Sequence, residues 1–130
     1  MPKKTVYTKR QLEKDFNFCQ AVRAGQLLFI SGCISWDEEG KVLAPDDWDG
    51  QVRNVYDELR STLAHFRLGF SDVVKETIYC RSMDSMVAAA SVRAQALGDI
   101  EPFASTWVEI SRLVDAGLLL EVEMTAMFPD

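Results

Sequence analysis

The fold is decided by residues 50–81, which read GQVRNVYDELRSTLAHFRLGFSDVVKETIYCR. Apolar side chains recur at i, i+3, i+4 and i+7 spacing in the first part of this stretch, and mostly charged residues lie between them. This spacing predicts an amphipathic helix that carries Val52, Val55, Tyr56, Leu59, Leu63 and Phe66 on one face. Gly69 is expected to end the helix as its C-terminal cap. Residues 71–81 are rich in Val, Ile, Thr and Tyr, which predicts a strand.

Similar sequence patterns before and after residues 50–81 predict further strands and a second helix. The N-terminal residues 1–17 are polar and irregular, apart from a short edge strand expected at 5–7. A second helix is expected over 86–97, with Asp84 or Ser85 as its N-cap and Gly98 at its end. The expected strands are 18–24, 26–35, 71–81, 105–113 and 118–127. This order is β-β-α-β-α-β-β, and two helices can cover only one face of such a sheet.

The second face of the sheet is expected to be partly apolar. Side chains alternate along a strand, so Leu118, Leu120, Val122, Met124 and Ala126 are assigned to the helix-covered core. By the same alternation Cys33 shares a face with Leu27 and Phe29. The second face would then gather Leu27, Phe29, Trp107, Leu119 and Met127 beside carboxylates and hydroxyls. We expect other copies of the chain to cover such a surface; a monomer with one partly apolar face is the alternative.

Length and composition limit the class of protein. A chain of 130 residues is expected to form a single domain, residues 1–130. The formal net charge of -6 disfavours nucleic-acid binding, because phosphate backbones are repelled. No apolar run approaches the roughly 18 residues of a membrane span, and no apolar segment follows the basic start. The three cysteines, Cys19, Cys33 and Cys80, are interpreted as reduced thiols of a cytoplasmic protein.

The residues that are missing narrow the chemistry further. His65 is the only histidine, and its position near a helix C-terminus favours a role as a dipole partner over catalysis. The chain has no CxxC pair and no glycine-rich nucleotide motif, so no metal or cofactor is expected. An enzyme of this composition would work with carboxylates, hydroxyls, backbone amides, arginines or a thiol. Cys33 is interpreted as a small buried apolar residue.

Six short motifs in order give the chain a specific resemblance over residues 18–127. It resembles the Rid family (RidA/YjgF), enamine and imine deaminases formerly described as L-PSP endoribonucleases. The motifs are Phe18-Cys19-Gln20-Ala21-Val22, the strand ending Ser31-Gly32-Cys33-Ile34, the helix with Gln51 and Leu59, Gly69 to Lys75, Ser105 to Leu113, and Leu120-Glu121-Val122-Glu123. The resemblance implies an α+β, chorismate-mutase-like fold with a mixed sheet and two helices on one face. It also implies a homotrimer with a central barrel and sites in the clefts between subunits.

The resemblance also implies hydrolysis of an enamine or imine to a ketone and ammonia. In archetypal members an arginine holds the substrate carboxylate and a last-strand glutamate positions a water. Glu121 takes the glutamate position, and a carboxylate in an interface ion-pair network is the alternative interpretation. The family arginine falls on Ser105, so the chain resembles a divergent subgroup without it; Arg81 and Arg93 are candidate replacements. The expected substrate-binding residues are Phe18, Ser31, Gly32, Ser105, Thr106, Trp107 and Arg93.

Three functions stay open at this point. The first is a Rid-type deaminase acting on a small enamine, imine or unsaturated amino acid, such as a 2-aminomuconate-like compound that suits the large ring of Trp107. The second is a non-catalytic trimer of the same fold that binds a metabolite or a regulatory partner. The third is a ribonuclease, which the acidic balance and the single histidine disfavour. Archetypal activity on 2-aminoacrylate is not expected, because Ser105 replaces the arginine.

Overall fold

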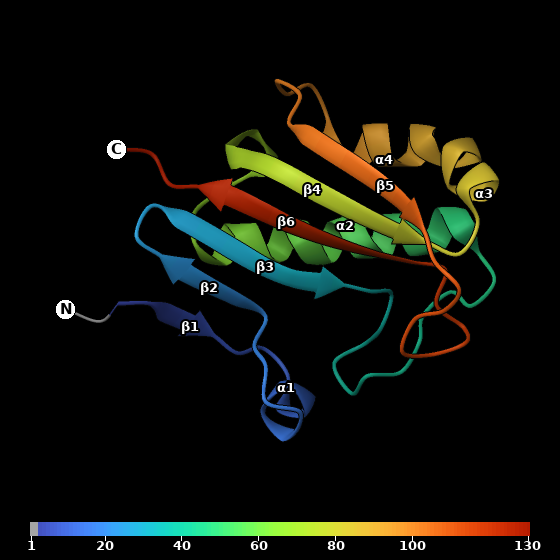
Figure 1. Cartoon of the computed structure of the whole chain (residues 1–130), viewed down its shortest axis with the longest axis horizontal. Coiled ribbons are helices and arrows are strands. Elements are labelled where there is room, and N and C mark those ends of the chain that lie inside the picture. Colours follow the sequence, from blue (N-terminus) through green and yellow to red (C-terminus); the bar gives the residue numbers. More distant parts are fainter. Residues whose placement is uncertain (1–2) are drawn as a thin grey trace.

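The computed structural model describes residues 3–130, which form one mixed six-stranded sheet with helices packed on it. The strand order is β1-β2-β3-β6-β4-β5. Neighbouring strands are antiparallel except β4 and β5, which run parallel and are connected through two helices (Figure 1). The elements are β1 Thr5–Tyr7, α1 Gln11–Asp15, β2 Ala21–Ala24, β3 Leu27–Cys33, α2 Trp48–His65, the 3-10 helix η1 Phe70–Asp72, β4 Val73–Cys80, α3 Met83–Ala88, α4 Ala90–Leu97, β5 Ala104–Glu109 and β6 Leu120–Met127. The α+β class and the mixed sheet are confirmed.

The core lies between the sheet and α2, which packs behind the sheet in Figure 1. The apolar stripe predicted for α2 is buried, apart from Phe66, which lies just beyond the helix and is partly buried. The alternation predicted for β6 is confirmed, since Leu120, Val122, Met124 and Ala126 are all at most 2% exposed. Burial of these side chains removes apolar surface from water, and this is the main force that holds the helices on the sheet.

Helix α2 ends earlier than expected. Asp47 caps its start, where the side chain accepts a hydrogen bond of 2.9 Å from the Gly50 N–H. At its end Arg67 adopts a left-handed conformation with φ 61°, and the Leu68 N–H reaches the Leu63 carbonyl at 2.9 Å. This pattern is a Schellman motif, so the chain has already left the helix before Gly69. Gly69 instead precedes η1, and its prediction as the C-cap is wrong.

The second predicted helix is two helices. The Ser82 hydroxyl accepts from the Ser85 N–H at 3.2 Å and starts α3 at Met83, earlier than either predicted cap. The chain bends at Ala89, which ends α3 and precedes α4. Gly98, with φ 75°, ends α4 as expected. The N-terminal segment contains the predicted strand β1, and it also contains α1, which was not expected.

Three residues that the sequence assigned to the second face lie in or against the core instead. A register shift between Ile30 and Cys33 turns Cys33 to the core, where it is 2% exposed beside the helices. Its interpretation as a buried apolar residue is confirmed. Trp107 pairs with the buried Ile78 of β4, so it lies on the helix-covered face and not on the second face.

Leu119 is also misplaced in the sequence-based assignment, because it is buried in the core at 9% exposure. Its backbone N–H donates to the Gln51 side chain at 2.9 Å, which ties the start of β6 to α2. The remaining apolar residues of the second face are exposed in one chain: Leu27 is 36%, Phe29 46% and Met127 47% exposed. We call this face of the sheet, opposite the helices, the open face.

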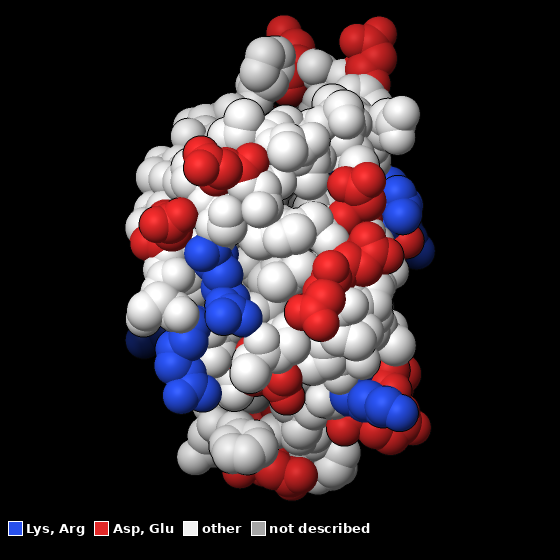
Figure 2. Space-filling model, turned by 90° about the vertical axis from the view of Figure 1, so that its right-hand side faces the viewer, with Lys and Arg blue, Asp and Glu red and all other residues white. Residues whose placement is uncertain are grey.

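Within residues 3–130 no helix is long and apolar enough to cross a membrane. Charged side chains are distributed over the surface that faces the viewer in Figure 2, with acidic groups on most parts of it.

His65 is the last residue of α2, as its dipole interpretation requires, and its ring stacks on Tyr7 at a centroid distance of 3.7 Å.

Candidate functional site

The Glu121 hollow, as we call it, is a recess of about 400 Å³ on the open face, where β3 passes the N-terminal segment. Glu121 points to the open face, because its neighbours Leu120 and Val122 are buried on the helix side. Gly32 lies directly beside it, and a Cβ atom at position 32 would overlap the Glu121 carboxylate. The hollow is lined by Leu12, Phe16, Phe18, Ser31, Gly32, Ile34, Trp36, Val114 and Glu121. It is therefore an apolar recess with one carboxylate in its wall.

The electrostatic environment of Glu121 favours its protonated form. Burial among apolar side chains raises the pKa of the Glu121 carboxyl, and the negative charge of Glu123 raises it further. No hydrogen bond to the Glu121 carboxylate offsets this effect within residues 3–130. Glu123 itself is engaged, since it accepts a hydrogen bond of 2.7 Å from the Tyr79 hydroxyl. A carboxyl with a raised pKa and no protein partner is suited to accept and return a proton.

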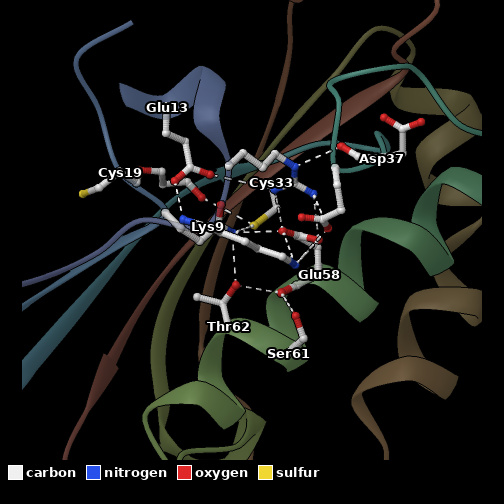
Figure 3. Close-up of polar contacts among 12 residues, drawn as sticks. Lys9, Glu13, Cys19, Cys33, Asp37, Glu58, Ser61 and Thr62 are labelled. Carbon is white, nitrogen blue, oxygen red and sulfur yellow. Dashed lines mark hydrogen bonds and ion pairs between the residues drawn. The ribbon is translucent and has the colours of Figure 1, made fainter. Parts of the chain in front are cut away.

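A buried polar cluster holds the N-terminal segment that forms one wall of the Glu121 hollow (Figure 3). Glu58 of α2 binds Arg10 at 2.8 Å and Lys9 at 3.0 Å. Gln20 donates to Thr62 at 3.0 Å, which attaches the start of β2 to the same helix turn. Because α1 follows Arg10 directly, these contacts fix the wall that Leu12, Phe16 and Phe18 contribute.

Ser31 has a structural bond within this wall. Its hydroxyl donates to the Cys19 carbonyl at 2.6 Å, so its proton is committed to the backbone. Phe18 is 43% exposed at the opening of the hollow. Burial is the main cause that raises the pKa of the Cys19 thiol, and Cys19 does not line the hollow.

A second recess, which we call the α4–β5 hollow, lies on the helix-covered side of the edge strand β5. It measures about 400 Å³ and is lined by Arg93, Ala94, Leu97, Gly98, Ile100, Pro102, Phe103, Ser105 and Trp107. Ser105 and Trp107 reach it because both residues point to the same side of β5. Among the residues that the structure describes, none lines both this recess and the Glu121 hollow.

Glu76 organises the polar side chains next to the α4–β5 hollow. It is 0% exposed, and its carboxylate binds Arg93 in an ion pair and accepts hydrogen bonds from Tyr56 and Ser105. The Trp107 indole N–H in turn donates to the Ser105 hydroxyl at 2.7 Å. Burial, the largest single influence, acts to lower the pKa of Arg93, but the hydrogen bonds and charges of Glu76 and Tyr56 together outweigh it and keep that pKa raised.

The predicted site residues therefore fall into three places. Phe18, Ser31, Gly32 and Glu121 share one hollow, and Arg93, Ser105 and Trp107 share the other. Thr106 lines neither: it lies on the open face and binds the Lys75 ammonium at 2.5 Å. Arg81, the other candidate replacement for the clamp, donates to the Ala116 carbonyl at 2.7 Å and also lines neither hollow.

Sequence reasoning missed several residues of both sites. Glu76 carried a signal, because alternation along β4 places it between core positions, where a carboxylate needs a partner. Its partner Tyr56 was assigned to the apolar stripe of α2. Leu12 and Phe16 carried no usable signal, since α1 is only five residues long. Within residues 3–130 no group of three or more His, Cys, Asp or Glu side chains is placed to hold a metal ion.

Comparison with known proteins identifies the family of this chain. The model of the Endoribonuclease L-PSP family matches residues 8–128. The chain belongs to the Rid/YjgF/L-PSP family. A RutC family protein of Pyrococcus horikoshii is 30% identical over 95% of this chain and 97% of its own length.

Solved structures of Rid family members agree with the fold. The crystal structure of Rv2704 from Mycobacterium tuberculosis, a member of the YjgF/YER057c/UK114 family, has a TM-score of 0.81 and 27% identity and covers 95% of this chain and 98% of its own. The Rid family protein YyfA from Yersinia pestis has a TM-score of 0.85 and 25% identity, with the same coverage. The chorismate-mutase-like fold expected from the motifs is confirmed.

Proposed function

We propose that this Rid family chain is a hydrolase that releases ammonia from a small enamine, imine or unsaturated amino acid. The observation that carries the proposal is the Glu121 carboxyl, which lies in an apolar recess with a raised pKa and no hydrogen bond within residues 3–130. A carboxylate in an ion-pair network within one chain would have a cationic partner in that chain. Glu121 has none among the residues that line its hollow.

The chemistry needs only a water molecule and one proton acceptor. The carbon of a C=N bond is electrophilic, so Glu121 would hold a water against it and accept one of its protons as the C–O bond forms. The C=N π electrons go to nitrogen, which takes this proton from Glu121 and becomes the amine of a carbinolamine. As this intermediate collapses, Glu121 accepts the proton of the new hydroxyl and passes it to nitrogen, the carbonyl forms, the C–N bond breaks and ammonia leaves. The products are one carbonyl compound and one ammonia for each imine and water consumed.

The complete site requires a second copy of the chain in this proposal. The Glu121 hollow opens on one face of the sheet and the α4–β5 hollow on the other, so a single chain does not join them. The open face carries exposed apolar side chains, and β5 is an edge strand. A homotrimer, which the family resemblance implies, would cover the open face and place the α4–β5 hollow of one chain against the Glu121 hollow of the next.

Ammonia release from enzymatically generated imines tests the function. Glu121→Gln should lower the rate at least about 100-fold, because the proton acceptor is lost. Glu123→Gln is the matched control: it should keep the activity, and removal of its negative charge should move the acid limb of the kcat/KM profile to lower pH. In the unsubstituted protein that limb should lie above the ordinary carboxyl pKa of about 4.3, because the base must be ionised. Equal rates for Glu121→Gln and the unsubstituted chain would refute the role of Glu121.

A non-catalytic binding function is the second candidate, and one observation favours it. In the α4–β5 hollow the Ser105 hydroxyl and Nη2 of Arg93 are already bonded to Glu76, which leaves only part of the Arg93 guanidinium for a substrate. A trimer of this kind would bind a metabolite without converting it. Ligand-dependent thermal stabilisation without ammonia release would identify this function.

A further inference from the structure

The α4–β5 hollow has the walls of a site for a flat apolar group. Phe103 and Trp107 supply two aromatic rings, and Leu97, Ile100 and Pro102 supply aliphatic surface. The Arg93 guanidinium carbon lies 5.6 Å from the centroids of both rings. A planar ligand can therefore stack against aromatic walls while it contacts a single cationic group.

Arg93 is held rigidly, yet one part of it is unused. Its Nε donates to the Tyr56 hydroxyl at 3.1 Å, and its Nη2 pairs with Glu76. Within residues 3–130, Nη1 makes no hydrogen bond or ion pair. The side chain is 17% exposed and lines the hollow. Arg93 thus offers free N–H donors from a fixed position.

The other side-chain donors of the hollow are already committed. The Ser105 hydroxyl proton goes to Glu76, and the Trp107 indole proton goes to Ser105. A ligand oxygen that enters the hollow therefore has Arg93 as its available side-chain donor. Hydrogen bonding from side chains to a ligand in this recess is therefore left to the Arg93 guanidinium, which lies near the rings of Phe103 and Trp107.

The charge of that guanidinium is balanced within the protein. Glu76 is fully buried and contacts Arg93 directly, so the two groups together carry no net charge. A carboxylate that bound Arg93 would place a second anion close to the buried Glu76 carboxylate, and like charges around one cation repel. A neutral carbonyl oxygen would accept the same hydrogen bond without that repulsion.

We propose that the α4–β5 hollow selects a planar, apolar compound with an uncharged carbonyl oxygen, and that the Arg93–Glu76 pair sets this preference. The inference rests on the proposed function in one respect: it names the part of the imine or enamine that enters this hollow. It narrows the substrate class toward conjugated amides, esters or ketones and away from carboxylates of the 2-aminomuconate type. Glu76 acts here as a positioning residue, because it works through Arg93.

Two matched probes that do not react, benzamide and benzoate, test the preference on the native assembly. They share a flat ring and differ in the charge of the group that would face Arg93. Binding is measured by NMR through the indole N–H signal of Trp107, which Trp107→Phe assigns. Benzamide should bind about tenfold more tightly than benzoate to the unsubstituted protein. The two probes are compared on the unsubstituted protein, and Trp107→Phe is the one variant that must fold.

The Glu76→Gln variant tests whether the Arg93–Glu76 pair causes the preference for an uncharged ligand. Tyr56 and Ser105 donate to different oxygens of Glu76, so the single amide oxygen of the introduced side chain can keep only one of these hydrogen bonds, and the amide no longer balances the charge of Arg93. Benzoate should gain roughly tenfold relative to benzamide in this variant. Glu123→Gln, which removes a carboxylate on the other face of the sheet, should leave the ratio unchanged.

The outcomes separate this inference from the proposed function. Tighter binding of benzoate than of benzamide, equal binding of the two probes, or binding of neither at millimolar concentration would overturn the inference. A folded Glu76→Gln variant with an unchanged ratio would overturn the role of the pair. None of these results bears on ammonia release, which is decided by Glu121→Gln. Loss of the proposed hydrolysis would likewise leave the probe ratio as measured.

Discussion

Gly32 has no side chain, and the Glu121 carboxylate lies in the space that a Cβ atom at position 32 would occupy. The importance of the carboxylate position can therefore be tested by adding one methyl group at residue 32. A Cβ atom at position 32 would overlap the carboxylate, which is the mobile end of its side chain. The Gly32→Ala chain can therefore fold if Glu121 swings aside. We expect its free energy of unfolding to change by less than about 1 kcal/mol. A displaced Glu121 carboxylate would no longer orient the attacking water, so kcat/KM for ammonia release should fall about 100-fold.

The matched control is Gly69→Ala. A Cβ atom at position 69 would meet no atom of the described residues within 4 Å, apart from its two chain neighbours, and the φ of -137° is open to any residue. This variant should retain both stability and activity. If Gly32→Ala kept the full rate while its fold was intact, the position of the Glu121 carboxylate would not matter for the reaction.

At the scale of elements, the Glu58 cluster ties the N-terminal segment to α2, and its strength should depend on pH. Burial, the largest single influence, acts to raise the pKa of Glu58, but the hydrogen bonds and positive charges of Arg10 and Lys9 together outweigh it and hold that pKa below its ordinary value. The folded state therefore binds the Glu58 proton less readily than the unfolded chain does. The stabilisation is complete above the unfolded carboxyl pKa of about 4.3 and is lost as the pH falls through the folded-state value.

The Glu58→Gln substitution should remove this dependence. It leaves the Arg10 side chain, which is 1% exposed, without its closest carboxylate. The free energy of unfolding at neutral pH should fall by roughly 3 kcal/mol. Urea unfolding at one protein concentration, repeated between about pH 3 and 7, measures both effects. Glu39→Gln, which alters an exposed turn residue, is the control. An acid-induced loss of stability as steep in Glu58→Gln as in the unsubstituted chain would contradict this account.

For the whole molecule, the open face decides the assembly. Phe29 is 46% exposed there, although it is an aromatic side chain in the interior of the sheet. Light scattering should give a mass of three times the 14.7-kDa chain. Phe29→Lys should reduce the mass to that of one chain, because it places a charge in an apolar interface. It should also abolish ammonia release, since the proposed site needs two copies.

The control for this experiment is Val87→Lys. Val87 is also an apolar residue, and it is 58% exposed on α3. It lies outside the open face, so its substitution should leave both the assembly and the activity unchanged. A chain whose mass equals that of a monomer at every concentration would refute the trimer.

Local periodicity determined much of this protein from sequence alone. The apolar spacing of α2 and the alternation of β6 each assign side chains to the core, because period 3.6 and period 2 are properties of a single element. The ordered motifs identified the family, and with it the mixed sheet. Glu121 was also placed on the correct face of β6, opposite Leu120 and Val122.

Only the tertiary structure decided which side of β5 meets the helices and which groups share a hollow. Trp107 points to the helix side because β5 pairs with β4 in a register that aligns it with Ile78, and register is a relation between strands. Cys33 changed sides at a bulge that alternation does not show. The bonds from Glu76 to Tyr56, Arg93 and Ser105 join residues from four separate elements. Such contacts depend on how the elements pack, which spacing along the chain does not encode.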